Sequence, residues 1–272
     1  MARYPHFDRG YDAGWFLKER TRLIKLTFQV STAAQERILK RIEEREKPFD
    51  NPPYREDGEP PYLEEWEDMH SGIHLLGLQA ISMLSDSLKV YFRTQREDLH
   101  YRVGKQAGAT FVELHKEPLG RVLGTDWSDC PADWAILEQV ARARNVAQHT
   151  QQLHSFRDKH DHKTLERFAD PFFIGDWQHY GDAERRFFKY PVLEVESHRL
   201  FAAIDEVNKL ADWVSSRIQE LQEGSIAATV RKGKRVRYAA CDTEECGQGR
   251  SRGRPRRSFG SLAPIGTNRK RH

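Results

Sequence analysis

Apolar side chains recur every three or four residues along most of the chain, which is the spacing of an amphipathic α-helix. Segments with the strict alternation typical of β-strands are few. We therefore expect an all-α protein, a bundle of four to five long helices joined by modest loops. The predicted helices cover residues 11–47, 61–96, 105–117, 132–155 and 193–223. The fourth of them is expected to start at Asp129 or Pro131.

Proline, glycine and capping residues predict where the other helices begin and end. Residues 47–61 hold several prolines, which cannot continue a helix, so this stretch is expected to be a surface connection. Ser31 and Thr32 favour caps over helix interiors and mark a place where the first helix could divide. Pro118 is expected to end the third helix, and Gly224 to cap the last one.

Charge is distributed unevenly along the chain. The net charge of the whole chain is +3, but residues 225–272 carry 13 lysines and arginines against 3 acidic residues, so the preceding residues are mildly acidic. The basic segment has few large apolar side chains and is expected to be disordered, because it cannot bury enough surface to offset the entropy of ordering. Three parts follow: an N-terminal helix with its proline-rich connection (1–60), the helical bundle (61–224) and a basic tail (225–272). Within the bundle, residues 158–191 are expected to form an irregular or partly extended insertion.

Composition excludes several classes of protein. No stretch approaches the roughly 18 apolar residues of a membrane span, and residues 1–10 lack the apolar core of a signal peptide. Three cysteines, Cys130, Cys241 and Cys246, do not make a disulfide framework, so a cytoplasmic protein is expected. His160 and His162 could bind a metal, but they lack a further ligand cluster nearby in the sequence. We expect neither a metal nor a cofactor.

The most reactive combination of side chains lies on the helix predicted over residues 132–155. Arg144 and His149 are separated by four residues, and Asn145 directly follows the arginine. At about 100° per residue, Asn145 and His149 share one helix face and Arg144 lies beside them. A guanidinium next to an imidazole can hold a phosphate and move a proton. These three residues are the candidate catalytic group.

An Arg-x4-His motif with a polar residue after the arginine, on a late helix of an all-α bundle, resembles the signature of the HEPN superfamily. The resemblance covers about residues 61–223, and the helix that includes residues 73–91 is similar to the family's first core helix. It implies a metal-independent endoribonuclease that acts as a homodimer on an RNA substrate. His149 would take the proton from the ribose 2′-hydroxyl, Arg144 would stabilise the phosphate and Asn145 would support them.

The resemblance also implies a biological role, and it allows a non-catalytic function as an alternative. Prokaryotic members are often toxins or phage-defence effectors, which implies an antitoxin or another regulatory partner. HEPN-like bundles also occur as non-catalytic dimeric scaffolds, which here would use the basic tail to bind nucleic acid. An unrelated helical protein with a solvated Arg and His is the third interpretation.

The basic tail contains a second motif. Residues 252–255 read Arg-Gly-Arg-Pro and are followed by further arginines. They resemble the core of an AT-hook, which lies extended in the minor groove of AT-rich DNA. A generic basic arm that attracts any polyanion, RNA included, is the alternative. Arg142 is expected to be a surface charge that could contact RNA backbone. The candidate nucleic-acid-binding residues are therefore Arg142, Arg252, Gly253, Arg254, Pro255, Arg256 and Arg257.

Overall fold

The structure is a computed structural model, and the parts of the chain that it describes are helical. It contains six described helices and two isolated β-bridges, with no strand in the part described, which confirms the expected all-α class. The helices are α1 (Ala13–Glu43), α2 (Leu63–Asp98), α3 (Phe111–Leu123), α4 (Trp134–Gln148), α5 (His162–Arg167) and α7 (Ser197–Ala239). The described residues are 12–51, 60–148, 159–160, 162–168, 171–174 and 191–239, with side chains up to residue 223.

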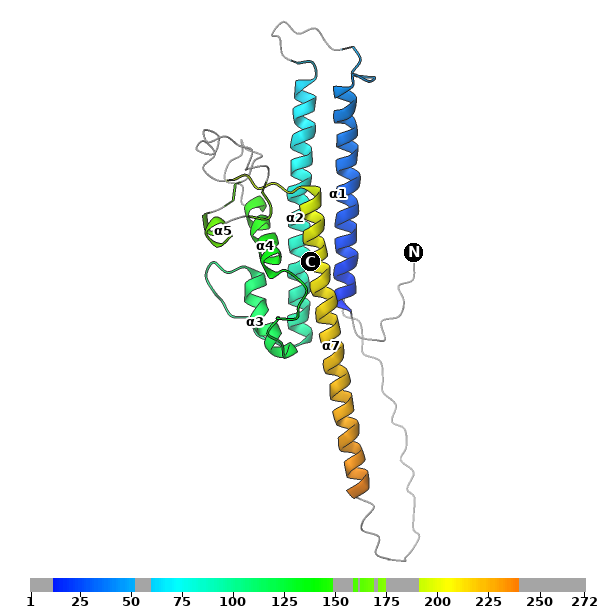
Figure 1. Cartoon of the computed structure of the whole chain (residues 1–272), viewed down its shortest axis with the longest axis vertical. Coiled ribbons are helices and arrows are strands. Elements are labelled where there is room, and N and C mark those ends of the chain that lie inside the picture. Colours follow the sequence, from blue (N-terminus) through cyan, green and yellow to red (C-terminus); the bar gives the residue numbers. More distant parts are fainter. Residues whose placement is uncertain are drawn as a thin grey trace, which may run out of the picture. The chain divides into compact units, whose positions relative to one another are not determined.

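The chain divides into two units, Met1–Gly224 and Ser225–His272, and the helical core belongs to the first. Among the described helices, none is both long and apolar enough to cross a membrane. In the first unit, α1 and α2 form a long hairpin, and the first part of α7 lies along it (Figure 1). A hydrogen bond of 2.8 Å from the Thr21 hydroxyl to Asn208 joins α1 to α7.

Helix α1 runs without interruption through Ser31 and Thr32, where the sequence allowed the helix to divide. The Thr32 hydroxyl donates to the Phe28 carbonyl one turn earlier, at 2.9 Å, so its side chain is satisfied inside the helix. Thr32 is buried against the bundle, and this packing outweighs its weak preference for a cap. The possible division at Ser31 and Thr32 is therefore not observed. Asp12 caps the helix start by accepting from the Trp15 backbone N–H.

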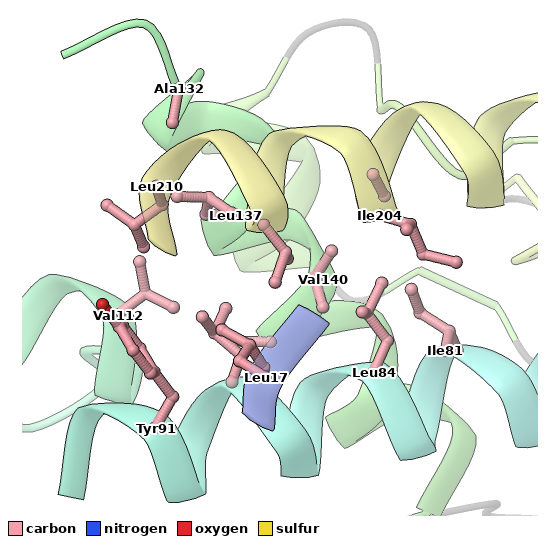
Figure 2. Close-up of a cluster of buried hydrophobic side chains, with 14 of the residues drawn as sticks. Leu17, Ile81, Leu84, Tyr91, Val112, Ala132, Leu137, Val140, Ile204 and Leu210 are labelled. Carbon is pink, nitrogen blue, oxygen red and sulfur yellow. The ribbon is translucent and has the colours of Figure 1, made fainter. Parts of the chain in front are cut away.

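The core is built from the apolar stripes of α2, α3, α4 and α7, to which α1 adds its inner face (Figure 2). Each large aliphatic side chain that is fully buried contributes about 1.5–3 kcal/mol relative to an exposed one. Phe173, which lies in the segment expected to be irregular, is also fully buried. Two isolated β-bridges, Lys159 with Val192 and Ile174 with Leu193, join described residues of this segment to the residues just after it. The short helix α5 in the same segment was not predicted. The fully buried side chains include Phe92, Ile81, Leu84, Leu88, Leu119, Leu137, Leu200 and Leu210.

The predicted bounds of the third helix were wrong at both ends. α3 starts after Thr110, whose hydroxyl accepts from the Glu113 N–H while the Glu113 carboxylate accepts from the Thr110 N–H. This capping box is a stronger start signal than any residue upstream. Pro118 lies inside α3, because Leu119 and Leu123 beyond it are buried and hold the last turn on the core. The helix ends at Gly124, not at Pro118.

The last helix is also longer than expected. The backbone of α7 continues past Gly224 to Ala239, so Gly224 is not its cap. Residues 225–239 contain no proline and are rich in alanine, arginine and lysine, which are good helix formers. One interior glycine costs about 1 kcal/mol, which is too little to end such a helix. Disorder was predicted for residues 225–272, but the backbone of residues 225–239 is helical. Residues 240–272 lie outside the described residues.

A buried polar pair connects α2, the loop after it and α3. The Tyr101 hydroxyl donates to the Phe92 carbonyl at 3.2 Å and lies 2.8 Å from Nδ1 of His115. The tautomer of His115 decides which of the two groups donates in this shorter contact. Burial, with a smaller contribution from the Arg96 charge, lowers the pKa of His115 from 6.5 to about 4. The imidazole is therefore neutral in the folded protein at neutral pH.

This shift predicts a loss of stability in acid. In the unfolded chain His115 binds its proton near pH 6.5, whereas the folded protein resists protonation down to about pH 4. The contribution of His115 to stability is therefore complete above pH 6.5, falls between pH 6.5 and 4, and is lost below. We expect a change of about 2 kcal/mol across this window. Urea unfolding of the wild type and of His115→Gln, from pH 7.5 to 4, measures it. The difference between the two proteins should narrow as the pH falls, and a constant difference would contradict the prediction.

Candidate functional site

Helix α4 carries the candidate catalytic residues, and its start differs from the expected one. The Asp133 carboxylate accepts from the Ala135 N–H at 2.8 Å, and its carbonyl accepts from the Leu137 N–H at 3.2 Å. Asp133 is therefore the cap, rather than Asp129 or Pro131, because it is the residue whose side chain reaches the free backbone N–H groups. Leu137 and Val140 are fully buried and fix the helix against α2 and α3. The described part of α4 ends at Gln148.

The Arg144 side chain lies between α4 and α2. Its guanidinium is 3.4 Å from the Asp86 carboxylate of α2, and only 23% of the side chain is exposed. A second guanidinium nitrogen donates to the Asn145 side-chain oxygen at 3.3 Å. The Arg144 Nε atom is buried and has no hydrogen-bond partner in the part of the chain that the structure describes. Within the described residues, Arg144 is thus held by contacts to Asp86 and Asn145.

Sequence reasoning did not find Asp86. It belongs to the run Ser85-Asp86-Ser87, which interrupts the apolar stripe of α2, and this interruption is the signal that could have identified it. Both serines are buried, whereas the Asp86 side chain is 52% exposed and faces the arginine. Asn145 is exposed next to it. The structure therefore brings Arg144 and Asn145 together at Asp86. His149, the third candidate residue, lies outside the described residues.

The expected surface position of Arg142 is wrong. Its side chain is only 11% exposed and pairs with Glu138 one turn earlier at 2.8 Å and with Glu113 of α3 at 3.3 Å. Arg167 of α5 joins the same two carboxylates, with distances of 2.6 Å to Glu138 and 3.0 Å to Glu113. Two arginines and two glutamates therefore form a partly buried ionic network that ties α3, α4 and α5 together, with Arg142 and Glu138 inside and Arg167 half exposed. Arg142 is not available for RNA backbone, because its charge is already used inside the protein.

The two histidines considered as metal ligands have separate roles. His160 is buried, and its Nε2 lies 2.6 Å from the Phe173 carbonyl. His162 is exposed and pairs with Glu166 within α5 at 3.2 Å. In the described ranges, no group of three or more His, Cys, Asp or Glu side chains is arranged to hold a metal ion. Burial raises the pKa of the Cys130 thiol, which keeps it protonated at neutral pH.

The tail residues with the AT-hook-like motif lie outside the described residues. This applies to all six of them, Arg252, Gly253, Arg254, Pro255, Arg256 and Arg257. The candidate site therefore consists, in the structure, of Arg144, Asn145 and Asp86. No protein-family model matches the chain, and no curated protein or solved structure matches it either.

Proposed function

We propose that the protein is a metal-independent endoribonuclease of the HEPN type, with Arg144, Asn145 and His149 as its catalytic residues. The observation that carries this proposal is the position of Arg144: a carboxylate on α2 holds the guanidinium beside an exposed amide, within the Arg-x4-His motif. An arginine on a solvated helix face would not need such a partner. An arginine that binds phosphate benefits from one, because it is preorganised before the substrate arrives.

The residue types support one reaction. His149 takes the proton from a ribose 2′-hydroxyl, and the 2′-oxygen attacks the neighbouring phosphorus. Negative charge builds on the phosphate oxygens and is stabilised by the Arg144 guanidinium, while Asn145 orients the phosphate. The bond from phosphorus to the 5′-oxygen breaks, and that oxygen takes a proton from solvent. The products are a 2′,3′-cyclic phosphate and a 5′-hydroxyl end. Asp86 acts as a positioning residue, because it holds Arg144.

The wider role follows from the same proposal. The enzyme acts in the cytoplasm as a homodimer, in which two motif helices build one RNA cleft. The basic tail binds nucleic acid through residues 252–257, either the RNA substrate or AT-rich DNA. An antitoxin or another regulator restrains the nuclease, as expected of a toxin or phage-defence effector. The competing role is a dimeric scaffold, and it is favoured by one observation: the Asp86 carboxylate already occupies part of the Arg144 guanidinium.

The test is incubation of the purified chain with cellular RNA and with a defined RNA oligonucleotide in EDTA. We expect cleavage despite the chelator and products that end in a 2′,3′-cyclic phosphate. A single 2′-deoxyribose at the cleaved position should block the cut there, because the attacking hydroxyl is missing. A mock purification from cells without the protein controls for contaminating nucleases.

Other outcomes separate the alternatives. Intact RNA together with tight binding of a nucleic acid duplex would favour the scaffold. Cleavage that requires a divalent metal, or that leaves 3′-hydroxyl ends, would contradict the proposed chemistry.

A further inference from the structure

A concave site lies away from the proposed catalytic residues, on another face of α4. This site, the α3–α4 cleft, has a volume of about 730 Å³ and is walled by α3, the loop after it, α4 and the end of α5. Glu138 lines the cleft, and its partner Arg142 is about 200° from Arg144 around the helix. Its volume is within the range of small-molecule sites. The catalytic proposal gives it no role.

Aromatic rings form the apolar wall of the α3–α4 cleft. Trp127 and Trp134 meet edge to face, with ring centroids 4.6 Å apart, and Phe168 stands at the end of α5. The Trp127 indole is fixed by its own N–H, which donates to the Lys116 carbonyl at 3.0 Å. Gly120 leaves room for this ring, since a side chain there would collide with it. Fixed aromatic walls of this kind suit a planar aromatic ligand.

The floor of the α3–α4 cleft carries charges that are already neutralised. Glu113 and Glu138 line it, and both carboxylates are bound by Arg142 and Arg167. Glu138 is more than nine-tenths buried, and its two oxygens accept from guanidinium groups only. The floor therefore has no carboxylate left to attract a cation.

Two charged side chains that line the cleft have no ion-pair partner within the described residues. One is Asp126, whose carboxylate accepts from the Ser128 N–H, and the other is Lys116. Its ammonium lies over the Trp134 ring, 4.9 Å from the ring centroid. Within the described residues no carboxylate lies within ion-pair distance of it, whereas Arg121, the other cation on α3 that lines the cleft, is paired with Glu117. An ammonium without a counter-ion favours an anion. The anion would lie beside the tryptophan that Lys116 covers.

We propose that the α3–α4 cleft binds a small planar aromatic anion, with its ring against Trp127, Trp134 and Phe168 and its anionic group at Lys116. The site is independent of the ribonuclease chemistry. It also touches the ionic network that fixes α4, so its occupant stabilises the packing of α3, α4 and α5.

The probe for this site is 8-anilinonaphthalene-1-sulfonate, an aromatic sulfonate whose fluorescence rises when it is bound. We expect saturable binding of one molecule to each chain, with quenching of tryptophan fluorescence. Lys116→Gln should weaken binding about tenfold, because it removes the charge-assisted contact but keeps a polar side chain. Lys89→Gln, at an exposed lysine of α2 away from the cleft, should bind as the wild type does. The uncharged analogue N-phenyl-1-naphthylamine should bind the wild type about tenfold more weakly than the sulfonate.

Three results would overturn the proposal. The first is the absence of saturable sulfonate binding to the wild type. The second is equal affinity of Lys116→Gln and wild type, which would place the probe elsewhere. The third is equal affinity of the neutral and anionic probes, which would make the cleft apolar without preference for an anion. Circular dichroism and thermal unfolding of each variant confirm that the comparison is between folded proteins.

Discussion

Alanine in place of Arg144 is expected to lower the rate of RNA cleavage by about a thousandfold, to the level reached when His149 is replaced by alanine. Arg144 is the cation of the motif and is held 3.4 Å from Asp86, so its charge is fixed where the phosphate would bind. Losing a preorganised charge removes stabilisation of the transition state that solvent cannot replace. Substrate binding should change much less than the rate of the chemical step.

Lysine at position 144 gives a sharper form of this prediction. It keeps the charge but loses the fork that reaches Asp86, Asn145 and a phosphate together. We expect Arg144→Lys to recover little activity. Asp86→Asn should lower the rate about tenfold, since the guanidinium remains but is less firmly positioned. A matched control is Arg93→Ala, which removes an exposed arginine of the same helix α2 and should leave cleavage unchanged.

Single-turnover cleavage of an RNA oligonucleotide in EDTA measures these rates. The variants should keep the helical circular-dichroism spectrum of the wild type. If Arg144→Ala cleaves RNA as fast as Arg93→Ala does, the motif on α4 is not the active site. If Asp86→Asn alone is inactive, Asp86 takes part in the chemistry rather than positioning Arg144.

The helical class could be predicted from periodicity because long amphipathic stripes leave little choice of structure. The same periodicity gave approximate bounds for α1 and α2 and an approximate start for α4. Local signals were misread where two of them competed. At α3, the capping box at Thr110 and Glu113 marks the true start of the helix, and the prediction missed it. Pro118 was predicted to end the helix but lies inside it. Burial of the last turn of α3 then decided the end, and burial is not visible in a single local pattern.

The site shows a different limit of sequence reasoning. Spacing within one helix predicted that Arg144 and Asn145 lie together, and their side chains do interact at 3.3 Å. It could not predict Asp86, which lies 58 positions earlier and meets Arg144 only through the packing of α2 on α4. The predicted surface position of Arg142 was wrong for the same reason. Arg142 pairs with Glu113 of α3, and Arg167 of α5 shares that carboxylate, so residues of other helices decide how far Arg142 is buried.

The partly buried ionic network around Arg142 should be the most sensitive polar feature of the fold. Glu138→Met is expected to lower the free energy of unfolding by about 3–5 kcal/mol, because Arg142 and Arg167 would lose a carboxylate that both contact. Arg142 is only 11% exposed, so water cannot replace the lost partner. Glu117→Met is the matched control. Glu117 forms the same i,i+4 pair, with Arg121, but its side chain is 82% exposed, so its loss should cost less than about 1 kcal/mol.

A double variant separates charge burial from the loss of one side chain. In Glu138→Met with Arg142→Met, one acid and one base are removed together, and Glu113 remains paired with Arg167. Replacement of a buried pair by apolar side chains of similar size is often neutral. We therefore expect the double variant to be more stable than Glu138→Met alone, as measured by urea unfolding at neutral pH. If it is less stable, the network contributes net attraction rather than mainly preventing an unpaired buried charge, and α4 is held in place by its ion pairs as much as by Leu137 and Val140.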